Sequence, residues 1–294
     1  MWDRIGPEGC DMSIGSPERV TIFEHGPHVF DVVDEGPLRG DLVVLLHGFP
    51  QNASSWSGVA AYLNAAGLRT VRFDQRGYAP GARPRGRFAY RPSQLVADVA
   101  ALVRELGSPK VHLVGHDWGA WVAWCAAAER PDLLDSLVTV SVPHPSAFLR
   151  SLVSSDQARR SGYMGAFSIP WLPEVSIRRR PERFGALLRA TGMPPSEVDR
   201  VLAELVPSTG LSGALNYYRA ALYVSPRHLR PVTVPTTHVW STRDEALSRT
   251  GAELCERFVK APYQLEIVDA THWVPDELPG PLAEAIVSRV RGRR

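Results

Sequence analysis

The chain has 294 residues, of which 44% are hydrophobic and 22% are charged, and its formal net charge is +2. This composition is typical of a globular protein and excludes collagen, coiled coils and disordered chains, and the small net charge gives no reason to expect a nucleic-acid partner. The longest apolar run, residues 118–128, is shorter than the roughly 20 residues of a membrane span, and the first residues lack the apolar segment of a signal peptide, so we expect no stable membrane insertion and a cytoplasmic location.

Elements of the first half alternate between strands and helices. Alternating apolar and polar residues at 18–24 and 29–33 predict a hairpin around Gly26 and Pro27. Short apolar runs predict strands, and longer periodic segments that end at Gly or Pro predict helices. The strands are expected at 42–46, 70–73, 110–114 and 137–142, and the helices at 56–66, 93–106 and 118–129.

Residues 143–229 interrupt this alternation with helical patterns divided by prolines, at 184–190, 196–205 and 215–223. Strands are then expected again at 236–240 and 264–268, and helices at 251–259 and 281–291. The order predicts the α/β class, with a mostly parallel sheet and helices on both faces. We divide the chain into a core, residues 1–142 and 230–294, and a helical lid, residues 143–229, inserted late in the sheet.

The first strand end that carries candidate catalytic residues has the sequence Gly115-His-Asp-Trp-Gly119. Its spacing is that of a nucleophile elbow, with Asp117 where a serine hydrolase has Ser. The helix that follows directs its unpaired N–H groups at the site, which favours an ionised carboxylate and offers the Trp118 N–H as an oxyanion donor. Asp117 as a plain helix N-cap remains the alternative. His116 is expected to support the elbow through its shape or hydrogen bonds.

A second strand ends in His47-Gly-Phe-Pro50, a turn that can present the Phe49 backbone N–H to the same oxyanion. An ordinary turn is the alternative, and the isomer of the bond before Pro50 is left open. We expect His47, Pro50 and Trp273 to contact the substrate.

Two further strands end near Asp244 and His272. The chain order of nucleophile, acid and histidine is the order in which hydrolases of this kind arrange their triads. Asp269 and Asp276 compete with Asp244 as the acid that orients His272.

With Asp117, Asp244, His272 and the Phe49 turn in this order, the chain resembles the α/β-hydrolase family, and within it the epoxide hydrolases. The resemblance runs from about residue 20 to the C-terminus and includes the loop at residues 74–84. Tyr163 and Tyr218 match the lid tyrosines with which those enzymes hold the oxirane oxygen.

This resemblance implies an epoxide hydrolase in which Asp117 opens the ring, forming an alkyl ester, and His272, oriented by Asp244, activates the water that hydrolyses it. The implied partners are a small apolar epoxide and water, with no cofactor. The sequence also lacks metal-ligand and phosphate-loop motifs, and its three cysteines are too far apart to suggest a zinc site or a disulfide framework. The oligomeric state stays open, a homodimer included.

Two other functions remain open. A haloalkane dehalogenase would use the indole of Trp118 for its halide, but it leaves Tyr163 and Tyr218 unexplained. A non-catalytic binding protein of the same fold would have no use for a complete triad.

The lid sequence around Tyr163 contains the small residues Gly162, Gly165, Ala166 and Ser168. We hypothesise that these residues widen the substrate tunnel. The alternative is that they allow two lid helices to approach each other closely.

Overall fold

The computed structural model describes residues 18–292, which form an eight-stranded sheet in the order β1-β2-β4-β3-β5-β6-β7-β8. The hairpin of β1 and β2 lies at one edge and pairs antiparallel with β4, and all further pairs are parallel. The strands are β1 (Ile22–His25), β2 (His28–Glu35), β3 (Leu42–Leu46), β4 (Arg69–Phe73), β5 (Val111–His116), β6 (Leu134–Val140), β7 (Thr236–Ser241) and β8 (Tyr263–Val268). The predicted α/β class with a mostly parallel sheet is confirmed.

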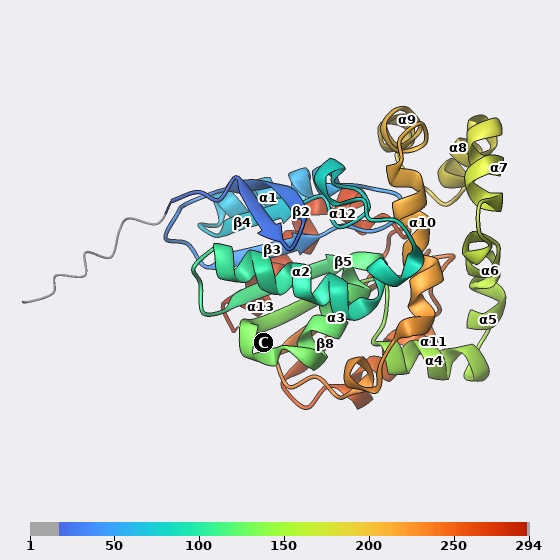
Figure 1. The fold of residues 1–294 in the computed structure, drawn as a ribbon. Coiled ribbons are helices and arrows are strands. Elements are labelled where there is room, and N and C mark those ends of the chain that lie inside the picture. Colours follow the sequence, from blue (N-terminus) through green and yellow to red (C-terminus); the bar gives the residue numbers. More distant parts are fainter. Residues whose placement is uncertain (1–17, 293–294) are drawn as a thin grey trace, which may run out of the picture.

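Helices cover both faces of the sheet (Figure 1). On one face, α2 (Pro92–Glu105) and α3 (Trp118–Glu129) pack against side chains that include Val44 and Leu46. On the other face, α1 (Ser57–Ala65) and α13 (Pro279–Val290) pack against Val43 and Leu45. Successive residues of β3 therefore enter opposite cores, as expected of a strand buried on both faces. The short helices α11 (Arg249–Leu254) and α12 (Val274–Glu277) complete the C-terminal part.

Between β6 and β7 the described chain contains helices and no strand, and we call residues 145–229 the helical insert. Figure 1 shows its helices stacked at one end of the sheet. They are α4 (Pro145–Ser154), α5 (Gln157–Arg160), α6 (Gly162–Ser168), α7 (Leu172–Arg179), α8 (Pro181–Ala190), α9 (Pro195–Arg200) and α10 (Gly210–Ala220). A π-helical turn, Val201–Leu205, follows α9, and 3-10 turns follow α10. The division into a core domain and a lid domain stays a prediction.

Several predicted boundaries differ from the observed ones; the strand expected at 18–24, for example, is β1, which begins only at Ile22. Two of the differences have a clear physical reason. The strand expected at 137–142 is β6, which begins at Leu134 and ends at Val140, because Ser141 leaves the strand with a left-handed φ of 68°. The helix expected at 251–259 ends at Leu254 and continues only as a 3-10 turn, because Val259 is extended and forms a bridge to Val232.

No helix within residues 18–292 is long and apolar enough to cross a bilayer. Cys125 and Cys255 are both free and buried. Cys10 and the N-terminal residues considered for a signal peptide lie outside the described residues.

Candidate active site

Asp117 lies in the tight turn between β5 and α3 and has a left-handed φ of 51°. The turn requires the two flanking glycines, because a Cβ on Gly115 would lie 2.3 Å from the Gly119 carbonyl oxygen, and one on Gly119 would lie 2.1 Å from that of Leu46. No side-chain capping bond from Asp117 to α3 is formed. The backbone therefore presents the carboxylate to the site instead of using it as a helix cap.

The turn after β3 reaches this carboxylate through its backbone. The Phe49 N–H donates to Asp117 Oδ1 at 2.7 Å, and the peptide bond between Phe49 and Pro50 is cis. Gly48 permits the approach, since a Cβ there would lie 2.4 Å from the Asp117 Cβ. Trp118 is the first residue of α3, so its N–H has no partner within the helix. One carboxylate oxygen thus already occupies a position where a backbone N–H can stabilise negative charge.

His272 lies between two carboxylates. Its Nδ1 is 2.8 Å from Asp244 Oδ2, and its Nε2 is 3.6 Å from Asp117 Oδ2. The other oxygen of Asp244 accepts the backbone N–H groups of Ala246 and Leu247 at 2.8 and 2.9 Å. Both oxygens of Asp244 are therefore held, and the acid can fix the orientation of the imidazole.

The two other candidate acids lie elsewhere. Asp269 is exposed and pairs with Arg243. The carboxylate of Asp276 accepts a hydrogen bond from Gln51 Nε2 at 2.8 Å. Burial, with the charge of Glu197, raises the pKa of Asp276 to about 7. Neither acid contacts His272.

The charges around His272 determine its protonation. Burial alone would lower the pKa of this histidine, but the negative charges of Asp244 and Asp117 and their hydrogen bonds raise it to about 10. In the same pair, the contact with His272 outweighs burial and lowers the pKa of Asp244. At neutral pH the resting site therefore holds an imidazolium between two carboxylates.

His116 contacts the backbone of His272. Its Nε2 is 2.9 Å from the His272 carbonyl oxygen, and burial lowers the pKa of His116 to about 4. A neutral imidazole that donates this bond fixes the backbone of His272, the kind of support that the sequence suggested for His116.

Above the triad lies an apolar cavity of about 170 Å³, here called the first cavity. Asp117 and His272 line it together with Pro50, Trp273 and both predicted tyrosines. The remaining wall is mostly apolar and comes from α6 and α8, with Phe167, Phe184, Leu187 and Leu188.

Tyr163 from α6 and Tyr218 from α10 face the triad across this cavity, with their ring centroids 6.1 Å apart. Burial and the charge of Asp117 raise the pKa of Tyr163. Burial and the charge of Tyr163 raise that of Tyr218, whereas a hydrogen bond with the Trp118 side chain acts in the opposite direction. Both hydroxyls are therefore protonated at neutral pH and can donate.

A second cavity, of about 290 Å³, meets the first at Asp117, Tyr163 and Tyr218. Trp118 and Trp121 from α3 line it, together with Phe148, Leu149 and Leu152 from α4 and Leu222 after α10. The Asp117 carboxylate thus stands where two apolar cavities join.

Two expectations about contacts with the cavity are corrected. His47 lines neither cavity; its Nε2 accepts the Gln75 backbone N–H at 3.0 Å, so it supports the turn instead. Gly162, Gly165 and Ala166 also line neither cavity and are exposed. A Cβ on either glycine would meet nothing within 4 Å, so neither a wider tunnel nor close helix packing explains these residues.

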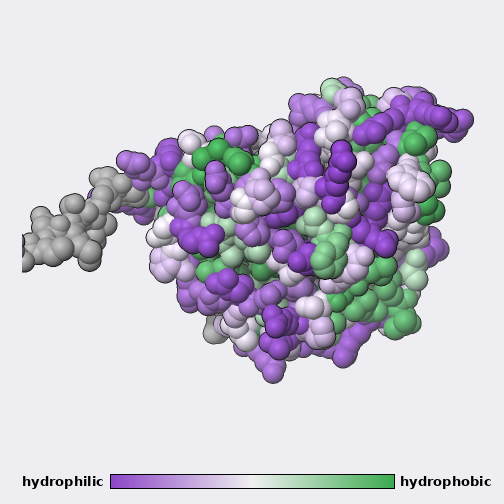
Figure 2. Space-filling view, in the orientation of Figure 1, coloured by the Kyte–Doolittle hydropathy of each residue, from purple (hydrophilic) through white to green (hydrophobic). Residues whose placement is uncertain are grey.

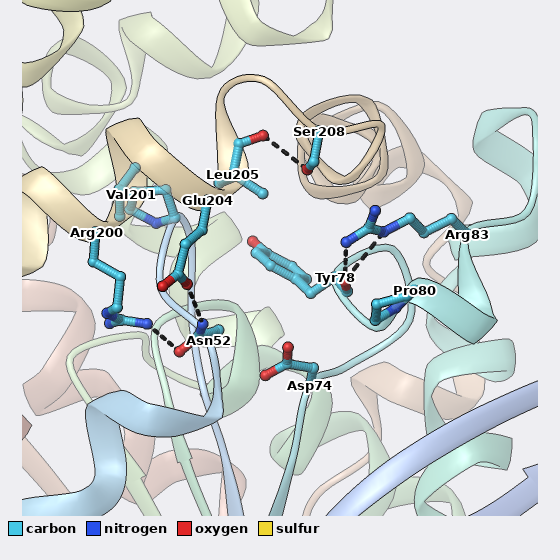
Figure 3. A pocket seen from close by; sticks show the side chains of 11 residues that line it. Asn52, Asp74, Tyr78, Pro80, Arg83, Arg200, Val201, Glu204, Leu205 and Ser208 are labelled. Atoms are coloured by element: carbon cyan, nitrogen blue, oxygen red, sulfur yellow. Dashed lines mark hydrogen bonds between the residues drawn. The ribbon is translucent and has the colours of Figure 1, made fainter.

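A separate polar pocket of about 100 Å³ lies beside the Pro50 turn (Figure 3). Arg200 and Glu204, from α9 and the π-helical turn, both hydrogen bond to Asn52 across it. Arg83 donates to the Tyr78 carbonyl oxygen at 2.6 Å. The two bonds to Asn52 join the helical insert to the loop that follows β3. The charged walls make this pocket unsuited to an apolar ligand.

Sequence reasoning missed Gln157, a fully buried residue of α5. Its Nε2 donates to the Ala246 carbonyl oxygen at 2.7 Å, and its Oε1 accepts the Ser248 N–H at 2.7 Å. The next turn adds a bond from Arg160 Nη1 to the Asp244 carbonyl oxygen at 2.9 Å. The insert thus holds the loop that carries Asp244 through three hydrogen bonds. No motif in the sequence indicates this contact.

The sequence profile described as "alpha/beta hydrolase fold" matches residues 41–279. The chain is also 32% identical over 287 residues to epoxide hydrolase 3 of Xenopus tropicalis, an alignment that covers 90% of this chain and 78% of that protein. The chain belongs to the α/β-hydrolase family, among the epoxide hydrolases.

Two further relatives of this α/β-hydrolase agree with the family, and the second of them is named as an epoxide hydrolase. The AB hydrolase superfamily protein YfhM of Bacillus subtilis is 31% identical, over 89% of this chain and 94% of that protein. The crystal structure of epoxide hydrolase A from Mycobacterium thermoresistibile superposes with a TM-score of 0.78 at 27% identity, covering 90% of this chain and 96% of that one.

Within residues 18–292, no cluster of three or more His, Cys, Asp or Glu residues could hold a metal ion.

Proposed function

We propose that this α/β-hydrolase converts an apolar epoxide and water into a vicinal diol through an ester on Asp117, with the helical insert as its lid. The observation that carries the proposal is the position of the Asp117 carboxylate, at the junction of two apolar cavities and across from two tyrosines. A carboxylate needs no base before it attacks a saturated carbon, which suits ring opening. The names of the relatives point to the same reaction.

Ring opening begins with the oxirane oxygen accepting hydrogen bonds from Tyr163 and Tyr218. Asp117 Oδ2 attacks a ring carbon, the carbon–oxygen bond of the ring breaks, and the alkoxide takes a proton from the tyrosine pair. Oδ1, which the Phe49 N–H already holds at 2.7 Å, becomes the carbonyl oxygen of the ester. The product of this step is an alkyl ester on the enzyme.

Ester formation also changes His272. Because one of the two carboxylates that raise the pKa of His272 becomes neutral, that pKa falls. The imidazolium then loses its proton, which replaces the one that the tyrosines gave to the alkoxide. His272 becomes a base only after the first step is complete, which gives the two steps a fixed order.

Hydrolysis uses this neutral His272. The imidazole takes a proton from water, the hydroxide attacks the Asp117 carbonyl carbon, and negative charge develops on Oδ1 beside the Phe49 and Trp118 N–H groups. Collapse of this intermediate breaks the bond between the carbonyl carbon and the former Oδ2, which takes the second proton of the water and leaves as part of the diol. The oxygen of water stays in the carboxylate, and His272 keeps the first proton as the imidazolium of the resting site.

The test is turnover of styrene oxide and of 1,2-dibromoethane, by the wild type and by the double variant Tyr163→Phe/Tyr218→Phe. We expect the wild type to form the diol and the double variant to lose activity by about 10²–10⁴-fold, the range of general-acid catalysis. If the wild type forms no diol and the double variant still releases bromide, the protein is a dehalogenase instead. Failure to turn over either compound would favour a binding protein.

Isotope labelling tests the ester. In a single turnover with excess enzyme in ¹⁸O-water, the diol should lack solvent oxygen, and repeated cycles should label Asp117. Label in the first diol would show that water attacks the epoxide directly.

A further inference from the structure

The segment that joins α6 to α7 exposes a group of neighbouring apolar side chains. Ile169 is 46% exposed, Trp171 79% and Leu172 58%, and Val175 follows one turn later with 44%. Figure 2 shows hydrophobic residues along the edge of the molecule where Figure 1 places the helical insert. Contiguous apolar surface of this kind marks a place where a partner binds.

Trp171 occupies its position at a conformational cost. Its φ of 59° is left-handed, a conformation that bulky residues rarely adopt. Within residues 18–292 its indole makes no hydrogen bond and no ring contact, although its backbone carbonyl accepts the Val175 N–H at 2.9 Å where α7 begins. A strained backbone that holds an unpacked Trp in solvent indicates a function outside the fold.

The neighbouring exposed surface of α6 carries small residues. Gly162, Gly165 and Ala166 are exposed on it, and a Cβ on either glycine would meet nothing within 4 Å. These are the small residues that neither the tunnel nor helix packing explains. They let a broad partner approach α6 and the Trp171 segment together.

Most exposed charged residues along helices α4 to α8 are arginines. Helices α4 to α8 expose seven arginines but only two acidic residues, Asp156 and Glu182. The arginines are Arg150, Arg159, Arg178, Arg179, Arg180, Arg183 and Arg189. Arg179 lies four residues after Val175 and so on the same side of α7. In the described chain Arg179, Arg180 and Arg183 form no ion pair.

From this combination we infer that the α6–α7 face of the insert binds reversibly to the surface of an anionic lipid bilayer. Trp prefers the boundary between headgroups and hydrocarbon, and arginines beside apolar side chains bind anionic headgroups. A second copy of this chain fits less well, because a twofold contact would place the arginine cluster opposite itself. The inference does not depend on the proposed reaction.

The cavities extend toward the same helical insert. Leu149 and Leu222 line the second cavity and are 45% and 87% exposed, so its wall continues into apolar surface. Docking would bring this wall close to the apolar compounds that a bilayer dissolves.

Flotation with vesicles tests the inference. The full chain should float with vesicles of phosphatidylcholine containing one third phosphatidylglycerol, and much less with phosphatidylcholine alone. Trp171→Ala and, separately, Arg179→Gln/Arg183→Gln should each weaken binding by about tenfold or more. The residues are exposed, and an unchanged Tm would show that the variants fold.

Matched controls remove similar groups from other faces. Tyr62→Ala takes away a side chain that is 56% exposed on α1, and Arg39→Gln/Arg104→Gln removes the same charge elsewhere. Both should bind like the wild type. Equal losses in the control and test variants would show unspecific attraction and overturn the inference, as would the absence of flotation.

Trp171→Phe separates contact with lipid from loss of binding. This variant should still float, but quenching of Trp fluorescence by brominated lipid should fall relative to the wild type. Unchanged quenching would place the lipid contact elsewhere. Light scattering tests whether this face binds a second copy of the chain instead. A dimer that dissociates in Trp171→Ala would assign the face to that second copy and overturn the inference.

Discussion

The side chain of His272 contacts Asp117 and Asp244, and these contacts define what its removal would do. His272→Gln leaves Asp117 and the two tyrosines in place, so under the proposed mechanism the ester should form but not hydrolyse. We expect turnover to fall by about 10³-fold or more. Mass spectrometry of the intact protein after mixing with epoxide should show one added substrate mass.

Asp244→Asn provides the comparison for this experiment. It keeps His272 but misorients it, so the ester should accumulate less completely. A His272→Gln protein that takes up no substrate mass would show that His272 also acts in ring opening.

The pKa of His272 predicts a pH dependence of stability. The folded value is about 10, against 6.5 for the free side chain, so folding favours the protonated form. This contribution is complete below pH 6.5 and is lost as the pH rises through 10. Urea unfolding from pH 6 to 10 should therefore show a fall in the free energy of unfolding that is smaller in His272→Gln. Parallel pH curves for the two proteins would contradict the charged pair.

At the scale of elements, α5 holds the loop that carries Asp244. Gln157→Leu removes both bonds to this loop and leaves the Ala246 carbonyl and the Ser248 N–H without their partner. We expect a loss of about 1–3 kcal/mol in the free energy of unfolding, the cost of an unsatisfied buried group. Hydrolysis of the ester should also slow in stopped-flow measurements, and kcat and KM should fall together, because the ester accumulates while ring opening, and with it kcat/KM, stays nearly unchanged.

Gln94→Leu is the matched control for Gln157→Leu. Gln94 lies half-buried on α2, and no hydrogen bond of its side chain occurs in the described structure. It should retain normal kinetics. If Gln157→Leu destabilises the fold without slowing hydrolysis, α5 has only a structural role.

The elements also show how far sequence reasoning reaches. Asp117, Asp244 and His272 could be predicted to meet because parallel strands bring their carboxyl ends to one edge. Tyr163 and Tyr218 came from a resemblance, and the structure brings them to the same cavity.

Other features could not be predicted. Gln157 lies in a four-residue helix whose packing partner is 89 residues away along the chain, and local periodicity carries no information about such a contact. His47 and Gly165 were expected at the cavity because His47 is close in sequence to Phe49 and Gly165 is close in sequence to Tyr163. His47 is turned away from the cavity toward Gln75. Gly165 lies two residues after Tyr163 on α6, a rotation of about 200° that brings it to nearly the opposite side of the helix.

At the scale of the whole molecule, two cavities meet at one carboxylate. An epoxide with a substituent on each ring carbon can place one in each cavity. Leu152→Trp, on α4, should fill part of the second cavity and reduce kcat/KM for epoxides with long chains on both carbons, while small terminal epoxides stay nearly unaffected. A chain-length series of both kinds measures this.

Leu187→Trp, in the wall of the first cavity, is the reciprocal variant. It adds the same volume on the other side, so the two variants should differ in which end of an asymmetric epoxide may be long. Equal losses for every substrate would show that the cavities do not act as separate binding sites.

The left-handed backbone at Asp117 has a consequence for the history of such enzymes. The position of the side chain at 117 is fixed by the turn, by its two glycines and by the Phe49 N–H. The backbone therefore determines where this side chain lies, and the identity of the residue determines its chemistry. Under the proposed mechanism, a single codon change at position 117 would exchange one nucleophile for another and leave His272, Asp244 and the Phe49 N–H in place. New reactions can therefore arise on this scaffold by one substitution at the elbow, followed by gradual adjustment of the walls above it.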